Sequence, residues 1–251
     1  TDISREGFIK SWRERLSHRP LIPPVTVKSG PILENVYEGK DIDMWKFPVP
    51  FWHEQDGGRY IGTADIIITR DPEEGWVNMG TYRVMVHGRD EIGIWISPGK
   101  HGRIHRTKYF DQGKPCPVVA CFGQDPLLHM VASRPEPFGS SELDYVGGIK
   151  GKPLEVIRGE ITGLPIPADS EFAIEGFCPP NQSRSEGPFG EFTGYYGSGE
   201  EQEPILEVKA AYFRNDPINL GAPPGRPPHD YSYMYSLIRS VMVKESLVKD
   251  G

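Results

Sequence analysis

Two glutamates lie close together in the segment SEGPFGEFTGYY, at positions 185–196. Glu186 and Glu191 bracket a Gly-Pro-Phe-Gly turn, whose proline and glycines favour a tight, rigid reversal of the chain. Two carboxylates in one cavity push their pKa values apart, and a neighbouring arginine keeps one of them ionised. If this turn aims both acids at Arg83, one is anchored and the other can carry a proton. A solvated acidic loop is the plainer interpretation of the same stretch.

A second group of polar residues has the donor types of a metal site. Asn78 lies within the strand-like run WVNMGTYR, His101 follows a predicted strand in SPGKHG, and Glu142 opens a predicted helix in SSELDY. An amide oxygen, an imidazole and a carboxylate suit Mn²⁺ or Mg²⁺ better than structural zinc, because no thiolate accompanies them. A packed histidine at a strand end and a glutamate at a helix N-terminus would explain the same residues without a metal.

The spacing of Asn78 and Arg83 bears on whether they can serve one site. Five positions separate them, so in a regular strand their side chains face opposite sides of the sheet. Gly80 lies between them, and a bulge there would change this relation.

The elements that must position these residues are mostly short. Strand-like runs occupy 63–70, 76–88, 92–98, 117–123, 153–161, 170–177 and 204–214, and helical spacing is found at 5–18, 102–110, 126–133, 141–149 and 232–248. In the first helix the apolar positions are Phe8, Ile9, Trp12 and Leu16. The apolar face of the last helix has no evident partner within the chain. The pattern predicts a β-rich α+β fold of antiparallel meander or barrel topology.

Composition excludes several classes of protein. Of the 251 residues, 37% are hydrophobic and 25% charged, which is typical of a globular domain with a sizeable core. A net charge of −7 argues against a general nucleic-acid binder. No apolar run reaches the roughly 18 to 20 residues of a membrane helix, and no signal peptide is evident. Cys116, Cys121 and Cys178 form no CxxC pair, which predicts reduced, buried thiols and a cytoplasmic location.

Several motifs together resemble the UbiD family of prenylated-FMN-dependent (de)carboxylases. They are ITRDP (68–72), NMGTYR (78–83), SPGKH (97–101), MVASRPEP (130–137), SSELDYVGG (140–148), LPIPADSEFAIEG (164–176) and EGPFGEFTGYY (186–196). The last two motifs are the most specific, and all of them occur in the family's order.

The resemblance implies a cofactor site. In this family an Asn, a His and a Glu bind Mn²⁺, which holds the cofactor phosphate, and Asn78, His101 and Glu142 occupy those places. A K⁺ ion is expected near the phosphate, sharing Glu142. The cofactor-binding residues implied are Thr63, Asn78, Gly80, Thr81, Tyr82, Arg83, Lys100, His101, Ser133, Arg134, Pro135 and Glu142. Lys100 departs from the Gln that some members have before the histidine.

The resemblance also implies an activity. Arg83 would pair with the substrate carboxylate, Glu186 would orient Arg83, and Glu191 would give the proton that replaces CO₂. The reaction expected is reversible, non-oxidative decarboxylation of an aromatic or α,β-unsaturated acid, through a transient covalent substrate–cofactor adduct. Tyr82, Trp95 and Phe189 either line an aromatic pocket or belong to the core.

The fold that the resemblance implies is a split β-barrel, flavin-reductase-like core with flanking α/β elements. We expect a helix and linker at 1–40, the prenylated-FMN-binding domain at 41–215, and at 216–251 a loop and helix leading to an absent C-terminal domain. The expected partners are other copies of the chain in a dimer or hexamer, or a completing subunit, with a flavin prenyltransferase supplying the cofactor. The alternatives are a non-catalytic or incomplete cofactor-binding subunit that needs a partner chain, and an ordinary flavin reductase.

Overall fold

A large antiparallel sheet dominates the computed structural model, which describes residues 4–17 and 20–250. In the described residues this sheet runs in the order β3-β6-β7-β13-β11-β8-β4-β5, with β2 and β12 also paired to β13. A small second sheet has the order β1-β9-β10. The strands are β1 (Val25–Thr26), β2 (Asn35–Glu38), β3 (Tyr60–Gly62), β4 (Ile66–Arg70), β5 (Val77–Gly80), β6 (Val84–Val86), β7 (Glu91–Ile94), β8 (Cys116–Phe122), β9 (Glu155–Arg158), β10 (Pro165–Pro167), β11 (Phe172–Cys178), β12 (Ser183–Glu186) and β13 (Glu201–Phe213).

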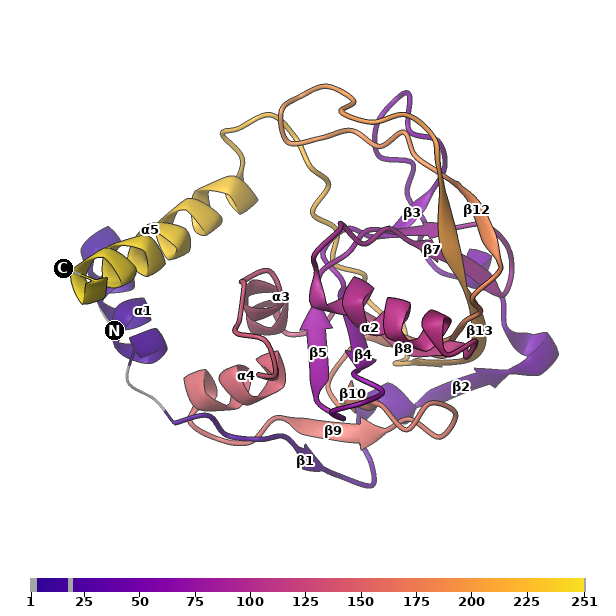
Figure 1. Ribbon diagram of the computed structural model, residues 1–251, viewed down its shortest axis with the longest axis horizontal. Helices are drawn as coiled ribbons and strands as arrows, with labels where there is room; N and C mark the ends of the chain where they lie inside the picture. Colours follow the sequence, from indigo (N-terminus) through magenta and orange to yellow (C-terminus); the bar gives the residue numbers. More distant parts are fainter. Residues whose placement is uncertain (1–3, 18–19, 251) are drawn as a thin grey trace.

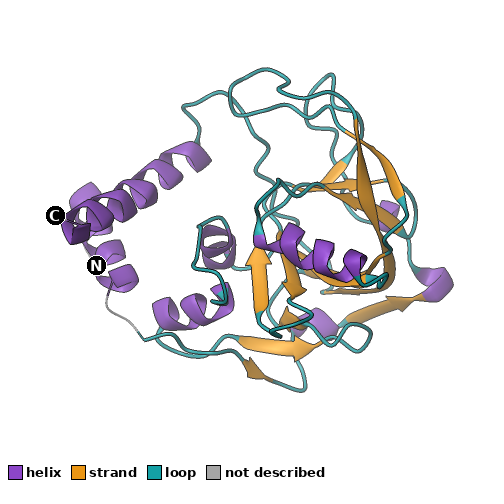
Figure 2. Ribbon diagram, in the orientation of Figure 1, coloured by secondary structure: helices purple, strands orange, loops and turns teal. Residues whose placement is uncertain are grey.

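Most of the helices lie to one side of this sheet (Figure 1). The helices are α1 (Arg5–Ser17), α2 (His101–Asp111), α3 (Pro126–Ala132), α4 (Glu142–Lys150) and α5 (Asp230–Asp250), with single 3-10 turns η1 (Pro31–Leu33), η2 (Gly39–Asp41) and η3 (Met44–Lys46). Figure 2 shows the strands gathered on one side of the molecule, with α1 and α5 on the other. The observed class is therefore mixed α+β with a large antiparallel sheet, as the sequence predicts.

The alternating pattern of the central strands explains why the sheet is buried on both faces. Along β8, Val119 and Cys121 join the apolar cluster that includes residues of α3 and α4, whereas Val118 and Ala120 join a second cluster on the opposite face. Successive side chains of a strand point to opposite sides, so each strand contributes to two cores. All three cysteines are free and buried in the structure, which confirms the prediction of buried thiols.

The predicted strand at 76–88 is two strands separated by a break. β5 ends at Gly80 and pairs with β4, while β6 begins at Val84 and pairs with β3 and β7. The facing rule for a regular strand therefore does not apply between Asn78 and Arg83. The break allows them to serve two neighbouring parts of one site.

The prediction that the last helix has no partner in the chain is wrong. α5 packs beside α1 (Figure 1), and Leu237, Ile238 and Val241 on α5 are buried. Ile238 belongs to the same cluster as Trp12 of α1. The side chain of Leu16, also predicted to lie on the apolar face of α1, is outside the described residues. None of the helices in the described part of the chain combines the length and apolar character that a membrane crossing requires.

Candidate active site

Arg83 and Glu186 form a two-pronged ion pair. Glu186 is the last residue of β12, and Arg83 lies in the break between β5 and β6. The Arg83 Nε and Nη2 atoms donate to Glu186 Oε1 and Oε2 at 2.7 and 2.6 Å. The Tyr60 hydroxyl, from β3, also donates to Glu186 Oε1, at 2.9 Å. Three donors from two residues thus hold the Glu186 carboxylate in one orientation.

Burial and charge fix the protonation of the groups around Glu186. Burial alone would lower the pKa of Arg83, but the hydrogen bonds and negative charge of Glu186 outweigh it and raise the pKa. Burial, and then the Glu186 charge, raises the pKa of Tyr60. Arg83 therefore stays cationic, and Tyr60 keeps the proton that it donates.

Glu191 is held far more loosely than Glu186. Its Oε1 lies 3.3 Å from Arg83 Nη1, and its side chain is 33% exposed, against 2% for the Glu186 side chain. The turn between the acids begins at Gly187, whose φ of +82° suits glycine. One acid is thus anchored and the other partly solvated, on opposite edges of the same guanidinium.

Aromatic rings enclose Arg83. The guanidinium carbon lies 4.6 Å from the centroid of the Trp95 ring and 5.3 Å from that of Phe189. Phe189 is buried against Tyr60, with ring centroids 4.2 Å apart. Trp95 and Phe189 therefore surround Arg83. Tyr82 instead lines a cavity that Arg83 does not line.

That cavity, of about 160 Å³, brings most of the predicted cofactor residues together. Its lining consists of Asn78, Gly80, Thr81, Tyr82, Gly99, Lys100, His101, Ala132, Ser133, Arg134, Pro135, Glu136 and Glu142. Thr63 is not in this lining, and its hydroxyl accepts a hydrogen bond from the Ala222 amide at 2.9 Å. Arg83 also lies outside the lining, although residues 80–82 join it directly to the cavity wall.

The first residues of two helices and a residue within one strand are the three predicted metal ligands. His101 begins α2, Glu142 begins α4, and Asn78 lies on β5. Glu142 is buried and accepts a hydrogen bond from the Met79 amide at 2.7 Å, which ties α4 to β5. The amide nitrogen of Asn78 is buried without a hydrogen-bond partner among the described residues.

Electrostatics at this cavity suit a cation. Burial raises the pKa of Glu142 to about 7 despite the Met79 hydrogen bond, so its negative charge lacks full compensation. Burial and the charge of Lys100 lower the pKa of His101, which favours the neutral imidazole that binds metals. In the described part of the chain no three His, Cys, Asp or Glu side chains form a metal cluster. The predicted ligands are two such side chains, His101 and Glu142, and the Asn78 amide, and the cavity beside them has room for ligands from outside the protein.

Unused donors in the same cavity suit an anion. The Arg134 guanidinium pairs with Glu136 through Nη2 at 3.1 Å, but its Nε and Nη1 atoms are buried without partners among the described residues. Buried donors normally have acceptors, so these unpartnered donors point to a ligand that supplies the acceptors. A phosphate beside a metal ion would supply them.

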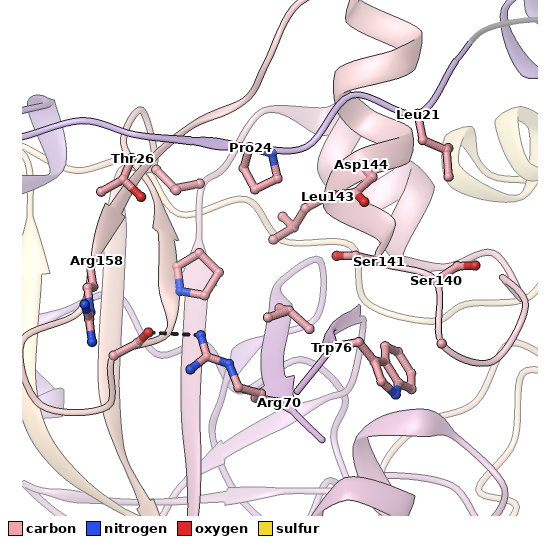
Figure 3. A pocket seen from close by; sticks show the side chains of 15 residues that line it. Leu21, Pro24, Thr26, Arg70, Trp76, Ser140, Ser141, Leu143, Asp144 and Arg158 are labelled. Atoms are coloured by element: carbon pink, nitrogen blue, oxygen red, sulfur yellow. Dashed lines mark hydrogen bonds between the residues drawn. The ribbon is translucent and has the colours of Figure 1, made fainter. Parts of the chain in front are cut away.

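A larger cavity, of about 700 Å³, lies elsewhere (Figure 3). It is lined by Arg70 and Arg158 on one side and by Ser140 and Ser141 at the start of α4 on the other. The Arg70 guanidinium already donates to the Gly163 carbonyl at 3.1 Å. None of the predicted catalytic or metal-binding residues lines this cavity, so the smaller cavity and the Arg83 cluster together form the candidate site.

Sequence reasoning missed several residues of the site. His53 and Asp56 precede β3 and Tyr60 begins it, and all three lie outside the elements that the sequence predicts. Tyr60 contacts Glu186, and Asp56 contacts the turn between the two acids. These contacts join positions more than 100 residues apart, and no local pattern indicates them.

Comparison with known proteins finds similar sequences and structures over most of the chain. The family model for the UbiD, 3-octaprenyl-4-hydroxybenzoate carboxy-lyase Rift-related domain matches residues 24–227. Pyrrole-2-carboxylic acid decarboxylase of Pseudomonas aeruginosa is 36% identical over 209 residues, which are 83% of this chain and 42% of that protein. Ferulic acid decarboxylase 1 of Saccharomyces cerevisiae is 33% identical over 236 residues, covering 92% of this chain and 47% of the relative.

A solved structure is similar over nearly the whole chain. It is an evolved dimeric form of the UbiD-class enzyme HmfF from Pelotomaculum thermopropionicum, in complex with prFMN. The TM-score is 0.85 at 28% identity, covering 96% of this chain and 55% of that one. The chain thus spans about half the length of the relatives it matches.

Proposed function

Because the chain belongs to the UbiD family, we propose that it carries the prenylated-FMN site and the acid–base residues of a carboxy-lyase. The reaction is the reversible, non-oxidative decarboxylation of an aromatic or α,β-unsaturated acid. The observation that supports this most is the arrangement of Arg83 between an anchored Glu186 and a looser Glu191. The decarboxylases among its relatives make an acid the expected substrate.

Arg83 is the expected substrate-binding residue. Glu186 occupies Nε and one hydrogen of Nη2, whereas the Nη1 edge has only the longer contact with Glu191, which a substrate carboxylate would replace. A guanidinium can take a carboxylate through two parallel hydrogen bonds, and Trp95 beside it keeps the group in place. Glu186 therefore orients Arg83 and does not compete for the edge that receives substrate.

Glu191 is the expected proton donor. It lies at that same edge, 3.3 Å from Nη1, and its partial exposure connects it to solvent protons. A group that exchanges protons with water can be reloaded in each catalytic cycle. When bound, the prenylated flavin would supply the electron sink for the loss of CO₂, so that no free carbanion would form.

Asn78, His101 and Glu142 would hold a Mn²⁺ ion, and that ion would hold the cofactor phosphate. The incompletely compensated charge of Glu142 supports the metal ion, and the unpartnered donors of Asn78 and Arg134 support a phosphate beside it. K⁺ would share Glu142. The remaining contacts to the cofactor are assigned to Thr63, Gly80, Thr81, Tyr82, Lys100, Ser133 and Pro135.

The finer features of the fold and assembly belong to the same proposal. The large sheet would form the split β-barrel of a flavin-binding domain at 41–215, with 1–40 and 216–251 as flanking segments. A dimer or larger homo-oligomer, or a completing subunit, would close the substrate pocket. A flavin prenyltransferase would supply the cofactor.

The test is to produce the chain with a flavin prenyltransferase and Mn²⁺ without oxygen, and to measure its absorbance spectrum, metal content and native mass. We expect a modified flavin and Mn²⁺ in equal amounts, and CO₂ release from pyrrole-2-carboxylate or ferulate. Bound cofactor without turnover would favour the alternative, an incomplete cofactor-binding subunit that needs a partner chain. Flavin reduction by a nicotinamide without CO₂ release would contradict the proposal.

A further inference from the structure

The turn between the two acids is anchored by a second turn at residues 53–57. The Gly190 amide donates to Asp56 Oδ1 at 2.9 Å, and the Gly57 amide donates to the Pro188 carbonyl at 2.7 Å. The Asp56 side chain is fully buried, with 0% exposure. The 187–190 turn is therefore held at two points, the Pro188 carbonyl and the Gly190 amide, by residues more than 100 positions away.

His53 holds Asp56 in turn. Its backbone amide donates to Asp56 Oδ2 at 2.9 Å, and its Nδ1 lies 3.1 Å from both carboxylate oxygens. The Nε2 atom lies 2.8 Å from the Pro224 carbonyl. His53 thus contacts Asp56 through one ring nitrogen and the segment around Pro224 through the other.

The two turns are packed too closely to slide past each other. A Cβ atom on Gly57 would lie 1.9 Å from the Gly187 carbonyl oxygen, and one on Gly190 would lie 2.6 Å from His53 Nδ1. The His53 ring also meets the Phe189 ring edge-on, with centroids 5.3 Å apart. Both glycines are needed for this approach, which fixes the position of the turn as well as its shape.

The two acids depend on this anchor to different degrees. Glu186 has three side-chain hydrogen bonds of its own, from Arg83 and Tyr60. Glu191 has one long contact with Arg83, and its backbone amide bonds to the Tyr195 carbonyl at 3.1 Å within the same loop. The direction in which Glu191 points is therefore set by its neighbour Gly190, and hence by Asp56.

We propose that Asp56, held by His53, is a positioning residue for Glu191: it fixes the 187–190 turn and so places the proton donor beside Arg83. This inference rests on the proposed function. The stretch DGGRY at 56–60 would then position both acids. Asp56 positions Glu191 through the Gly190 amide, and the Tyr60 hydroxyl holds Glu186 directly.

The test compares Asp56→Asn with the parent chain carrying cofactor. An asparagine must turn its NH₂ group toward either the Gly190 amide or the His53 donors, so one set of hydrogen bonds is lost. We expect kcat for pyrrole-2-carboxylate or ferulate to fall about ten-fold or more, because small displacements of a catalytic group are that costly. The KM should stay within about two-fold, because the Arg83–Glu186 pair is untouched. Amide hydrogen exchange in the 187–192 segment should rise about ten-fold.

A matched control is Glu175→Gln. Glu175 is also a fully buried carboxylate that accepts from backbone amides, those of Ile161 and Thr162, and from a tyrosine, Tyr212. Its loss should lower stability without changing exchange at 187–192 or kcat. His53→Gln removes only the outer support and should show the same changes as Asp56→Asn at smaller size, which provides a second test if Asp56→Asn does not fold.

Unchanged exchange at 187–192 in both the Asp56 and His53 variants would overturn the proposal. So would faster exchange with an unchanged kcat, since the turn would then move without consequence. A parent chain that never releases CO₂ counts against the proposed decarboxylation. Amide hydrogen exchange needs no turnover, so it still decides whether Asp56 anchors the turn.

Discussion

Arg83 makes two ion pairs of very different strength. The pair with Glu186 is bidentate and almost fully buried, whereas that with Glu191 is single, longer and a third exposed on the acid's side. Removing one partner of a buried pair leaves an uncompensated charge, while an exposed pair contributes little. The two acids should therefore differ in what they contribute to stability.

We expect Glu186→Gln to lower the free energy of unfolding by about 3 kcal/mol, because Arg83 is left buried without its counter-charge. Glu191→Gln should cost less than about 1 kcal/mol, because water already screens that pair. Urea unfolding of the two variants beside the parent measures the difference. Equal losses would contradict the division into an anchored and a loose acid.

Asp65 provides a pH-dependent prediction away from the cofactor cavity. It is buried, and neither carboxylate oxygen has a hydrogen-bond partner from another described residue. Burial raises its pKa well above the ordinary 3.8. The folded state thus binds this proton more tightly than the unfolded chain does. The free energy of unfolding therefore falls as the pH rises above about 3.8, and it stops falling once the carboxyl ionises in the folded state.

Asp65→Asn should flatten this part of the stability profile, because the amide does not titrate. Thermal unfolding of parent and variant across the acidic and neutral range measures it. A slope that is identical in the two proteins would show that Asp65 is not the group responsible.

At the scale of elements, the break between β5 and β6 shapes the cofactor cavity. A Cβ atom on Gly80 would lie 2.3 Å from the Tyr82 hydroxyl and 2.4 Å from the ring carbon that bears it. Tyr82 is buried and also accepts from the Gly102 amide at 3.4 Å, so it has little room to move. Gly80 therefore permits the chain to fold back between Asn78 and Arg83.

Gly80→Ala should weaken Mn²⁺ and flavin binding about ten-fold or more, because the displaced Tyr82 enters the cavity or shifts α2. Equilibrium dialysis with Mn²⁺ and flavin fluorescence measure both affinities. Gly88→Ala is the control, since its Cβ would meet only Glu91 at an ordinary 3.7 Å. Unchanged binding in Gly80→Ala would mean that this turn does not shape the site.

Local patterns predict some elements well and others not at all. The helices at α2, α3 and α4 agree with their predicted ranges to within a residue or two, since their apolar spacing is regular and Asp125 caps α3. Short strands such as β3 and β12 escape prediction, because β3 has only three residues and β12 has no apolar residue, so neither carries a measurable hydrophobic period. The strand at 76–88 was predicted as one element because nothing local distinguishes a break at 81–83 from a bulge at Gly80.

Some residues of the candidate site can be found from the sequence, and others cannot. Asn78, His101 and Glu142 were singled out by their unusual settings, and the family resemblance gave Arg83, Glu186 and Glu191 their roles. Asp56, His53 and Tyr60 could not be found, because their importance arises from contacts with residues 186–190 and 224. Those contacts exist only in the folded chain.

At the scale of the whole molecule, α5 returns to the N-terminal helix. Ile238 is 4% exposed and lies in the main cluster with Trp12, whereas Val248 on the same helix is 65% exposed. Burial of a side chain that joins the helix to the core should contribute to global stability, and an exposed one should not.

Ile238→Ala should lower the free energy of unfolding by about 2 to 4 kcal/mol, the usual cost of truncating a buried isoleucine. Val248→Ala should change it by less than about 0.5 kcal/mol. Chemical unfolding followed by circular dichroism measures both. A neutral Ile238→Ala would mean that α5 does not dock on the body of the chain.

The proposed activity requires that Glu186 and Glu191 have different roles beside Arg83. The most direct measurement is CO₂ release by a Glu191→Gln variant that carries prenylated FMN and Mn²⁺, beside the parent protein. We predict an unchanged cofactor spectrum and a loss of turnover by about a hundred-fold or more, as expected when a general acid is removed. Full activity in Glu191→Gln with cofactor bound would contradict the assignment of the proton donor.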